Sequence, residues 1–244
     1  MSSHGNSDSN FPHTRWTLVA QARDGGEKTV AGALSSLCSL YWRPVYAFFR
    51  RSGKTSHDAE DLTQGFFADL LNRDFLRNVG REKGRFRTFV LTSTKNYLAK
   101  DWRYKSAAKR GGGDFPLSLD FEDAERSFQL DPSDNLTPDL EFERRWVLTL
   151  LESVLQTVRT EYKRAGKVAL FDELSSSLTN SSVQKPHAEI AKDLDMTEGA
   201  VKVAAHRLKK RYKEALKLEV SRTVESDEDV QSEIRYLMSV FSQR

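Results

Sequence analysis

Apolar residues recur at spacings of three and four along most of this chain, and this spacing limits the folds open to it more than any other feature. One face of an α-helix returns about every 3.6 residues, whereas a half-buried strand alternates about every second residue. No convincing strand alternation is evident in the sequence. The clearest helical stripes are formed by Leu34, Leu37, Tyr41, Val45, Phe48 and Phe49 and by Leu140, Val147, Leu150, Leu151, Val154, Val158 and Tyr162. We therefore predict an all-α protein.

Charge is distributed unevenly along the chain. The formal net charge of +3 is too small to identify a nucleic-acid binder by itself. However, Lys95 to Arg110 contains six Lys or Arg and one acid, and Lys202 to Lys217 contains seven and one. Between them, Asp114 to Glu143 holds ten acids and a single basic residue, Arg126. The sequence thus predicts two basic helical modules flanking an acidic segment.

Glycine and proline mark the expected boundaries. Gly111 to Gly113 would lose too much backbone entropy to continue a helix, and three prolines interrupt the acidic segment that follows. We predict two small helical domains joined by an acidic linker, with a C-terminal extension that packs on the second domain. The expected spans are a disordered tail at 1–12, a first domain at 13–112, the linker at 113–138, a second domain at 139–218 and the extension at 219–244.

Several functional classes are disfavoured by composition. No stretch approaches the roughly 18 consecutive apolar residues of a membrane span, and the polar N-terminus does not look like a secretory signal, so we expect a cytoplasmic protein without a membrane partner. Cys38 is the only cysteine, which excludes an intrachain disulfide. The five histidines lack metal-ligand spacing, and no phosphate-binding loop or nucleophile elbow occurs. We expect no enzymatic activity, no metal and no cofactor.

The segment from Pro186 to Leu216 carries the most specific motif. A helix-turn-helix needs a small residue where its helices touch, here Ala191, and a turn residue that accepts positive φ, here Asp195. Thr197 is placed to cap the second helix. The positions expected to be buried hold Ile190, Leu194, Met196, Val201 and Ala204. We predict a helix-turn-helix in the second domain.

The second helix of this motif would present a basic face. Lysine and arginine donate to phosphates or to guanine, so such a face suits a DNA major groove, although a solvated helix surface is the plainer interpretation. Besides Glu198, the predicted DNA-facing residues are Thr197, Gly199, Lys202, Val203, His206, Arg207 and Lys210.

A second segment, Gly84 to Arg110, alternates aromatic and basic residues. Aromatic rings stack on unpaired bases while cations follow the phosphate backbone, which favours single-stranded DNA. The alternative is that Phe89 and either Tyr97 or Leu98 belong to the core. The candidate contacts are Arg85, Arg87, Lys95, Asn96, Lys100 and Arg103, together with Arg81 in the preceding loop.

A third segment, Asp58 to Leu71, predicts an amphipathic helix with Ser56 as its candidate cap. Alone it indicates no more than a solvated acidic helix. Its apolar face holds Leu62, Phe66 and Leu70, and another face holds Asp61, Gln64, Gly65 and Ala68.

Taken in their order along the chain, with the acidic linker between the second and the third, the three segments resemble the sigma-70 family of bacterial RNA polymerase sigma factors. The resemblance is specifically to its extracytoplasmic-function group. The resemblance covers about Leu34 to Lys109 and Asp139 to Leu216. It implies a protein that brings core RNA polymerase to promoters, with the β′ clamp helices, the β flap and promoter DNA as partners and an anti-sigma or other regulatory protein as a further one. The acidic linker would follow the RNA path of the polymerase.

The resemblance also assigns roles to residues. The acidic helix would bind polymerase, the basic-aromatic segment would engage the melted −10 element, and the helix-turn-helix would read the −35 element. Gly65, Asp195 and Ala204 depart from the family pattern, which usually has Glu, Gly and a basic residue there. The polymerase-binding residues implied in this way are Asp58, Asp61, Leu62, Gln64 and Phe67.

Two further hypotheses follow from the sequence. The first is a stand-alone helix-turn-helix regulator that binds operators without polymerase. The second concerns the extension, where Ser226 is the candidate cap of a helix that covers a DNA-binding or polymerase-binding face. The apolar stripe of that helix is expected to hold Val230, Ile234, Leu237 and Phe241.

Overall fold

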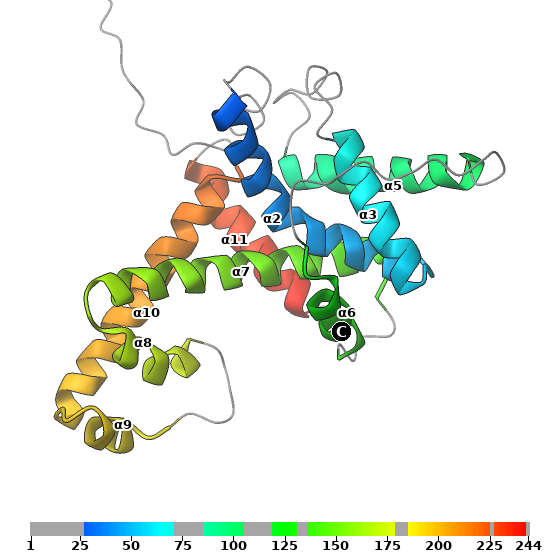
Figure 1. The fold of residues 1–244 in the computed structure, drawn as a ribbon. Coiled ribbons are helices and arrows are strands. Elements are labelled where there is room, and N and C mark those ends of the chain that lie inside the picture. The colour runs from blue at the N-terminus through cyan, green and yellow to red at the C-terminus, as the bar shows by residue number, and fades with distance from the viewer. Residues whose placement is uncertain are drawn as a thin grey trace, which may run out of the picture. The chain divides into compact units, whose positions relative to one another are not determined.

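The chain is all-helical wherever its structure is described. The computed structural model describes residues 27–70, 85–104, 119–130, 136–178, 185–224 and 227–242. These residues form α-helices and one short 3-10 helix, and strands are absent from them (Figure 1). The all-α prediction is therefore confirmed for this part of the chain. The expected N-terminal tail lies outside the described residues.

None of the helices in these ranges is long and apolar enough to cross a membrane.

The chain divides into two compact units. The first unit comprises Met1–Val147 and Ser221–Arg244, and the second comprises Leu148–Val220. Within the first unit, α2 packs against α3, α5 and α6, and α3 also contacts α5. The helices that contribute to the first unit are α2 (Glu27–Arg51), α3 (Ser56–Leu70), α5 (Phe86–Tyr104), α6 (Phe121–Gln129), the beginning of α7 (Pro138–Arg164) and α11 (Asp227–Ser242).

Aromatic rings form much of the core of the first unit. Tyr41 of α2 meets the edge of Phe86 of α5 at 5.3 Å between ring centroids and stacks on Trp146 of α7 at 6.4 Å. Such pairs add about 0.5–1.5 kcal/mol each beyond the area that they bury. Cys38 is fully buried in this core, and burial raises the pKa of its thiol to about 12. The core therefore ties α2 to α5 and to the start of α7.

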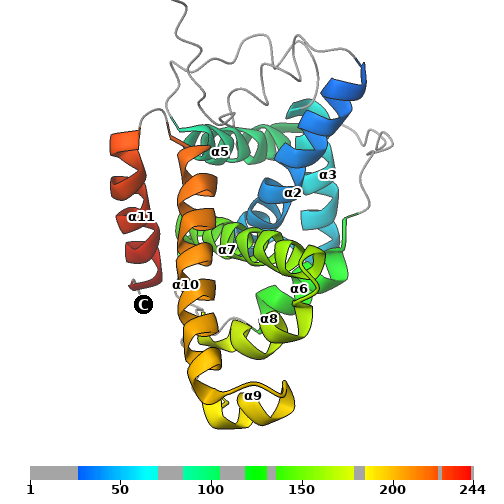
Figure 2. The same cartoon turned by 90° about the vertical axis from the view of Figure 1, so that its left-hand side faces the viewer.

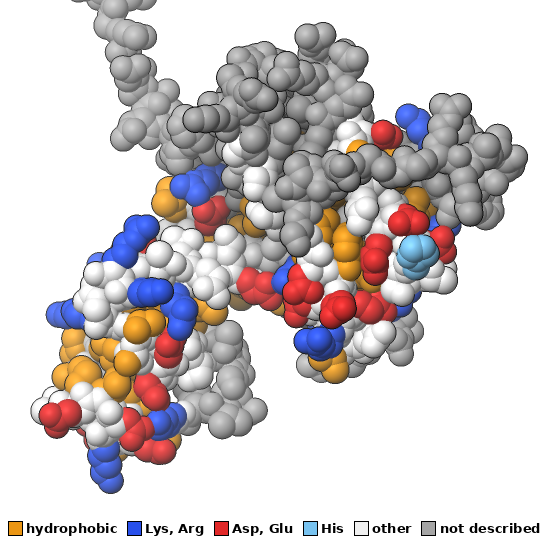
Figure 3. All heavy atoms as spheres, in the orientation of Figure 1, with side chains coloured by type: hydrophobic (Ala, Val, Ile, Leu, Met, Phe, Trp, Pro, Cys, Tyr) orange, Lys and Arg blue, Asp and Glu red, His pale blue; other side chains and the backbone are white. Residues whose placement is uncertain are grey.

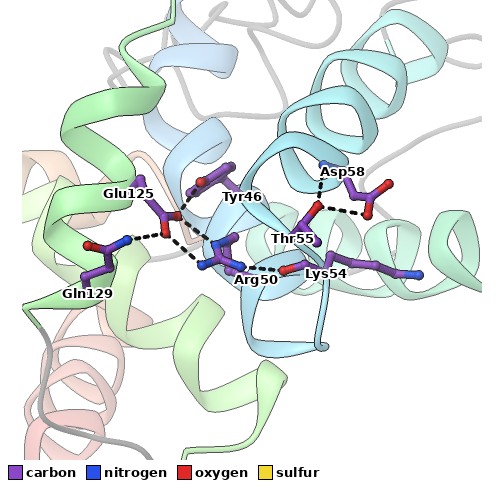
Figure 4. A network of polar contacts seen from close by, with 7 residues as sticks. All are labelled: Tyr46, Arg50, Lys54, Thr55, Asp58, Glu125 and Gln129. Carbon is purple, nitrogen blue, oxygen red and sulfur yellow. Dashed lines mark hydrogen bonds and ion pairs between the residues drawn. The ribbon is translucent and has the colours of Figure 1, made fainter.

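The start of α3 is capped one residue earlier than the sequence suggested. The backbone N–H of Asp58 donates to Thr55 Oγ1 at 3.1 Å, and the Thr55 hydroxyl donates to the Asp58 carboxylate at 2.9 Å (Figure 4). Thr55, rather than Ser56, thus satisfies a free N–H group at the helix start.

The segment predicted as a linker at 113–138 contains a helix, α6, that packs on α2. Phe121 of α6 packs on Trp42 and Tyr46 of α2, with ring centroids 5.4 and 5.5 Å away. Glu125 accepts two hydrogen bonds of 2.7 Å from the Arg50 guanidinium (Figure 4). Asp123 pairs with Arg43 of α2 in the same way, so acids of the predicted linker form ion pairs with arginines of α2.

The boundary between units also differs from the prediction. α7 is continuous across residue 147, and its first turns carry buried Phe142 and Trp146 of the first unit. α11 is grouped with the first unit as well, and its Glu233 pairs with Arg87 of α5 and with Arg85 just before that helix. The extension was expected on the second domain, whereas the contacts group it with the first unit. A helix without a break gave no local sign of this boundary.

The second unit is built around one apolar cluster. α7 ends at Arg164 and is followed by a turn at Gly166, where φ is +68° and the N–H of Lys167 donates to the Tyr162 carbonyl at 2.8 Å, an arrangement that favours glycine. The unit continues through α8 (Val168–Leu174), a 3-10 helix (Ser175–Ser177), α9 (His187–Asp193) and α10 (Glu198–Ser221). Its buried core consists of Val154, Val158, Phe171, Leu174, Ile190, Ala191, Val201, Ala205, Leu208 and Ala215.

Candidate nucleic-acid interface

The turn between α9 and α10 has the backbone geometry that the motif predicts. Asp195 has φ +51°, the only positive φ of a non-glycine residue among those described. The N–H of Met196 donates to the Ala191 carbonyl at 2.8 Å, which closes the end of α9. Ala191 is buried, as expected for the small residue at the contact. In Figure 2, α8 and α9 lie at the N-terminal end of α10.

Thr197 caps α10 as predicted. Its side-chain oxygen accepts a hydrogen bond from the N–H of Ala200 at 3.2 Å, and its carbonyl accepts one from Val201 at 3.1 Å. The cap fixes where the helix begins, and therefore which residues face outward.

The buried and the exposed residues of α10 lie on different faces of the helix. Val201, Ala205 and Leu208 are buried in the core of the second unit, and Tyr212 is half-buried. Val203 is half exposed at 50%, although it is a large apolar residue. The predicted DNA-facing residues are all exposed, namely Thr197, Gly199, Lys202, Val203, His206, Arg207 and Lys210.

Ion pairs leave much of this face available. Lys202 pairs with Glu198 one turn earlier at 2.7 Å, with both side chains at least half exposed. Arg211 pairs with Glu161 of α7, and this pairing lowers the pKa of Glu161. Arg207 and Lys210 have no ion pair with any carboxylate of the described residues. Their cations can therefore pair with phosphates or bases.

A groove of about 830 Å³ lies beside this face, within the second unit. Its lining includes apolar Leu170, Leu194 and Val203, with Arg207 among the polar residues. Figure 3 shows hydrophobic side chains next to Lys and Arg side chains in this region. An apolar side chain beside a cation suits the edge of a thymine next to a phosphate or guanine.

The basic-aromatic segment on α5 is only partly exposed. Lys95 is exposed but pairs with Asp139 of α7 at 2.6 Å, while Asn96 and Lys100 are exposed. The backbone of Arg103 lies within α5, but its side chain is not among those described, and Arg81 lies outside the described residues.

Arg85 and Arg87 are engaged within the first unit. Arg87 is 4% exposed and lies 3.0 Å from Glu143 and 3.1 Å from Glu233. Its guanidinium lies over the rings of Trp146 and Tyr236, at 4.8 and 4.6 Å from their centroids. Arg85 is 38% exposed and pairs with Glu233 at 2.7 Å. In this arrangement Arg87 has no surface to offer to DNA.

The acidic helix α3 presents some of its predicted partner-binding residues and buries others. Asp61 and Gln64 are exposed, and Asp58 is held by Thr55 at the helix start. Leu62 and Phe67 are 5% and 1% exposed, so they stabilise the core of the first unit and have little surface for direct contact. Figure 3 shows acidic side chains gathered over α3 and α6.

Gly65 has a structural role that sequence reasoning missed. A Cβ at this position would clash with the hydroxyl of Tyr97, which lies across α3. The Tyr97 ring also meets the edge of Phe66 at 5.7 Å. The absence of a side chain at Gly65 thus accommodates an aromatic residue of α5, and only the long-range contact reveals the reason.

Comparison with protein-family models, with curated proteins and with solved structures gave no match to this chain.

Proposed function

We propose that this chain is a sigma factor of the sigma-70 type, which binds core RNA polymerase and directs it to specific promoters. The observation that carries the proposal is the outward face of α10. Thr197 sets the start of this helix, Asp195 sets the turn before it, and Lys202, Arg207 and Lys210 are exposed on its outward face. A recognition helix docked in a major groove needs a fixed turn and an exposed basic stripe of this kind.

The first unit supports the polymerase-dependent form of the proposal. α3 exposes Asp61 and Gln64 on a helix whose opposite face is buried in the core. Exposed polar residues on a well-anchored helix can dock on another protein without loss of the fold. We propose that this face contacts the β′ clamp helices and that Asn96 and Lys100 of α5 engage the melted −10 strand.

The test is run-off transcription from a library of randomised promoters, using core bacterial RNA polymerase with and without this protein. We expect protein-dependent transcripts whose templates share paired −10 and −35 elements. The variant Arg207→Ala should change the enriched −35 sequence or reduce its enrichment, because Arg207 lies on the outward stripe. Lys163→Ala is the control, since Lys163 is an exposed cation of α7 in the second unit and lies outside the helix-turn-helix.

A stand-alone helix-turn-helix regulator is the second candidate. The burial of Arg87 favours it, because a residue assigned to the −10 strand is engaged inside the protein. Tight operator binding by the protein alone, without any polymerase-dependent transcript, would support this candidate over the sigma factor. The predictions for Arg207 and Lys163 apply to both candidates, so the polymerase dependence decides between them.

A further inference from the structure

The helix α11 carries a carboxylate where its pattern calls for an apolar residue. Among the described side chains of α11, the buried stripe consists of Val230, Glu233, Leu237 and Val240, at spacings of three, four and three. The sequence had suggested a stripe through Ile234, which is half-buried, and through Phe241, whose side chain is outside those described. Glu233 is 1% exposed, and burial of a carboxylate is costly unless it is paired and hydrogen-bonded. The position therefore calls for an explanation beyond packing.

The partners of Glu233 are the two arginines at the start of α5. One carboxylate oxygen lies 2.7 Å from Arg85 Nη1, and the other lies 3.1 Å from Arg87 Nη1. A single anion thus bridges two guanidinium groups, which is also how a phosphate is held between arginines. Glu143 of α7 adds a second carboxylate, 3.0 Å from Arg87.

The cluster is incompletely satisfied. Within the described part of the chain, Arg87 Nε and Nη1, Glu143 Oε2 and Glu233 Oε2 make no hydrogen bond of good geometry, although they lie within ion-pair distance. A buried ion cluster repays its desolvation only when its geometry is excellent and its polar atoms are satisfied. This cluster therefore contributes little net stability. Buried polar clusters of this kind, whose hydrogen bonds are incomplete, are candidates for functional sites.

We propose that Arg85 and Arg87 form a phosphate-binding site for single-stranded DNA, and that α11 occupies it with Glu233 as an internal antagonist. This inference rests on the proposed function and adds its regulation. In the closed state seen here, Glu233 stands in for the phosphate and Tyr236 covers the Arg87 guanidinium. DNA reaches the two arginines when α11 moves away, so the first unit binds the melted strand weakly until then.

Charge removal at Glu233 tests the proposal. Binding of a short, fluorescein-labelled single-stranded DNA of mixed sequence to the full chain is followed by anisotropy at several salt concentrations. Glu233→Gln should bind about tenfold more tightly than wild type, and its salt slope should steepen by about 0.7 for one freed cation. Deletion of residues 225–244 should increase affinity at least as much. Arg235→Ala, an exposed cation of the same helix, is the control for charge changes on α11 that do not involve the cluster.

A double variant identifies the freed cation. If Glu233 acts through Arg85, then Arg85→Ala should abolish the gain caused by Glu233→Gln, whereas independent sites would leave the gain intact. Wild-type or weaker affinity of Glu233→Gln and of the deletion, with helical circular dichroism preserved, would overturn the proposal.

A measurement on the wild-type chain covers the case in which these variants fail to fold. Hydrogen exchange of residues 227–242 should accelerate when the single-stranded DNA is bound, because α11 has to leave the cluster. Unchanged or slower exchange would overturn the proposal. Promoter-dependent transcription by the wild-type chain, tested separately with core polymerase, distinguishes failure of this inference from failure of the proposed function.

Discussion

The start of α5 and the outward face of α10 are both basic in sequence, yet the structure treats their cations in opposite ways. Arg87 is buried between two carboxylates and two aromatic rings, whereas Arg207 is exposed and has no ion pair with a carboxylate of the described residues. The same type of side chain is thus an internal structural cation in one place and a surface cation in the other. Basic composition identifies where nucleic acid can bind, and burial decides which cations can reach it.

Removal of Arg87 should have the largest effect on stability. Arg87→Ala leaves Glu143 and Glu233 buried without their shared cation, and it removes the group stacked on Trp146. We expect a loss of about 3–5 kcal/mol in the free energy of unfolding of the first unit, the usual cost of breaking a buried pair on one side. Arg207→Ala should change this free energy by less than about 0.5 kcal/mol.

Urea unfolding followed by circular dichroism measures both variants. Arg87→Lys should recover little of the loss, because an ammonium group does not reproduce the planar fork between two carboxylates or its stacking on the rings. Equal stability of the Arg87 and Arg207 variants would show that the buried cation does not stabilise the fold more than the exposed one.

The second largest effect concerns Glu125 of α6. Hydrogen bonds from Arg50 hold the pKa of the Glu125 carboxyl down at about 2, against an ordinary value of 4.5. Because the folded pKa is depressed, the stabilisation is fully present above pH 4.5 and is lost as the pH falls toward about 2. Glu125→Gln should therefore destabilise the first unit at neutral pH by about 1.5–3 kcal/mol, the range for hydrogen bonds to charged groups.

The pH dependence of this effect tests its cause. The difference between wild type and Glu125→Gln should shrink as urea unfolding is repeated at pH values between 4.5 and about 2. Glu122→Gln is the control, because Glu122 is an exposed acid of the same helix. A difference that stays constant down to pH 2 would mean that the Glu125 ion pair does not stabilise α6 on α2.

Sequence patterns predicted the local structure of the second unit far better than they predicted the long-range contacts of the first unit. The turn residue, the cap and the two faces of α10 depend on local spacing, so Asp195, Thr197 and Val201 could be placed without any tertiary information. The DNA-binding roles of the α10 face stay predictions. Local composition could not show that Arg87 would meet residues of α7 and α11, because those contacts join distant segments.

The helix within the acidic segment was not predicted, for a related reason. Its three apolar positions on α6, Phe121, Ala124 and Phe128, are too few to stand out among acids as a stripe. The helix nevertheless packs on α2, because the guanidinium of Arg50 lies 5.1 Å from the centroid of the Phe128 ring while it pairs with Glu125. Charges that look solvating in a sequence become structural when a partner helix supplies the opposite charge.

Substitution at the outward face of α10 should have an intermediate effect, visible only in DNA binding. Arg207→Ala should reduce affinity for the selected promoter by about 1–3 kcal/mol if Arg207 makes a bidentate contact to a base. If it contacts phosphate alone, the main change is a salt slope lower by about one, with little change in sequence preference. Fluorescence anisotropy on the promoter-bound complex, at several salt concentrations, distinguishes the two. Binding identical to wild type at every salt concentration would remove Arg207 from the interface.

The smallest expected effect tests the turn itself. Asp195 has φ +51°, a left-handed conformation that glycine adopts without the steric cost of a Cβ. Asp195→Gly should therefore raise the free energy of unfolding of the second unit by about 0.5 kcal/mol, since part of the relief is offset by the greater freedom of glycine in the unfolded chain. Lys192→Gly is the control with the opposite sign, because Lys192 is an exposed residue within α9, where glycine should cost about 1 kcal/mol. Thermal unfolding of the two variants in parallel measures the difference. If both destabilise equally, the turn does not depend on the left-handed residue, and the fixed start of α10 would have to come from the Thr197 cap alone.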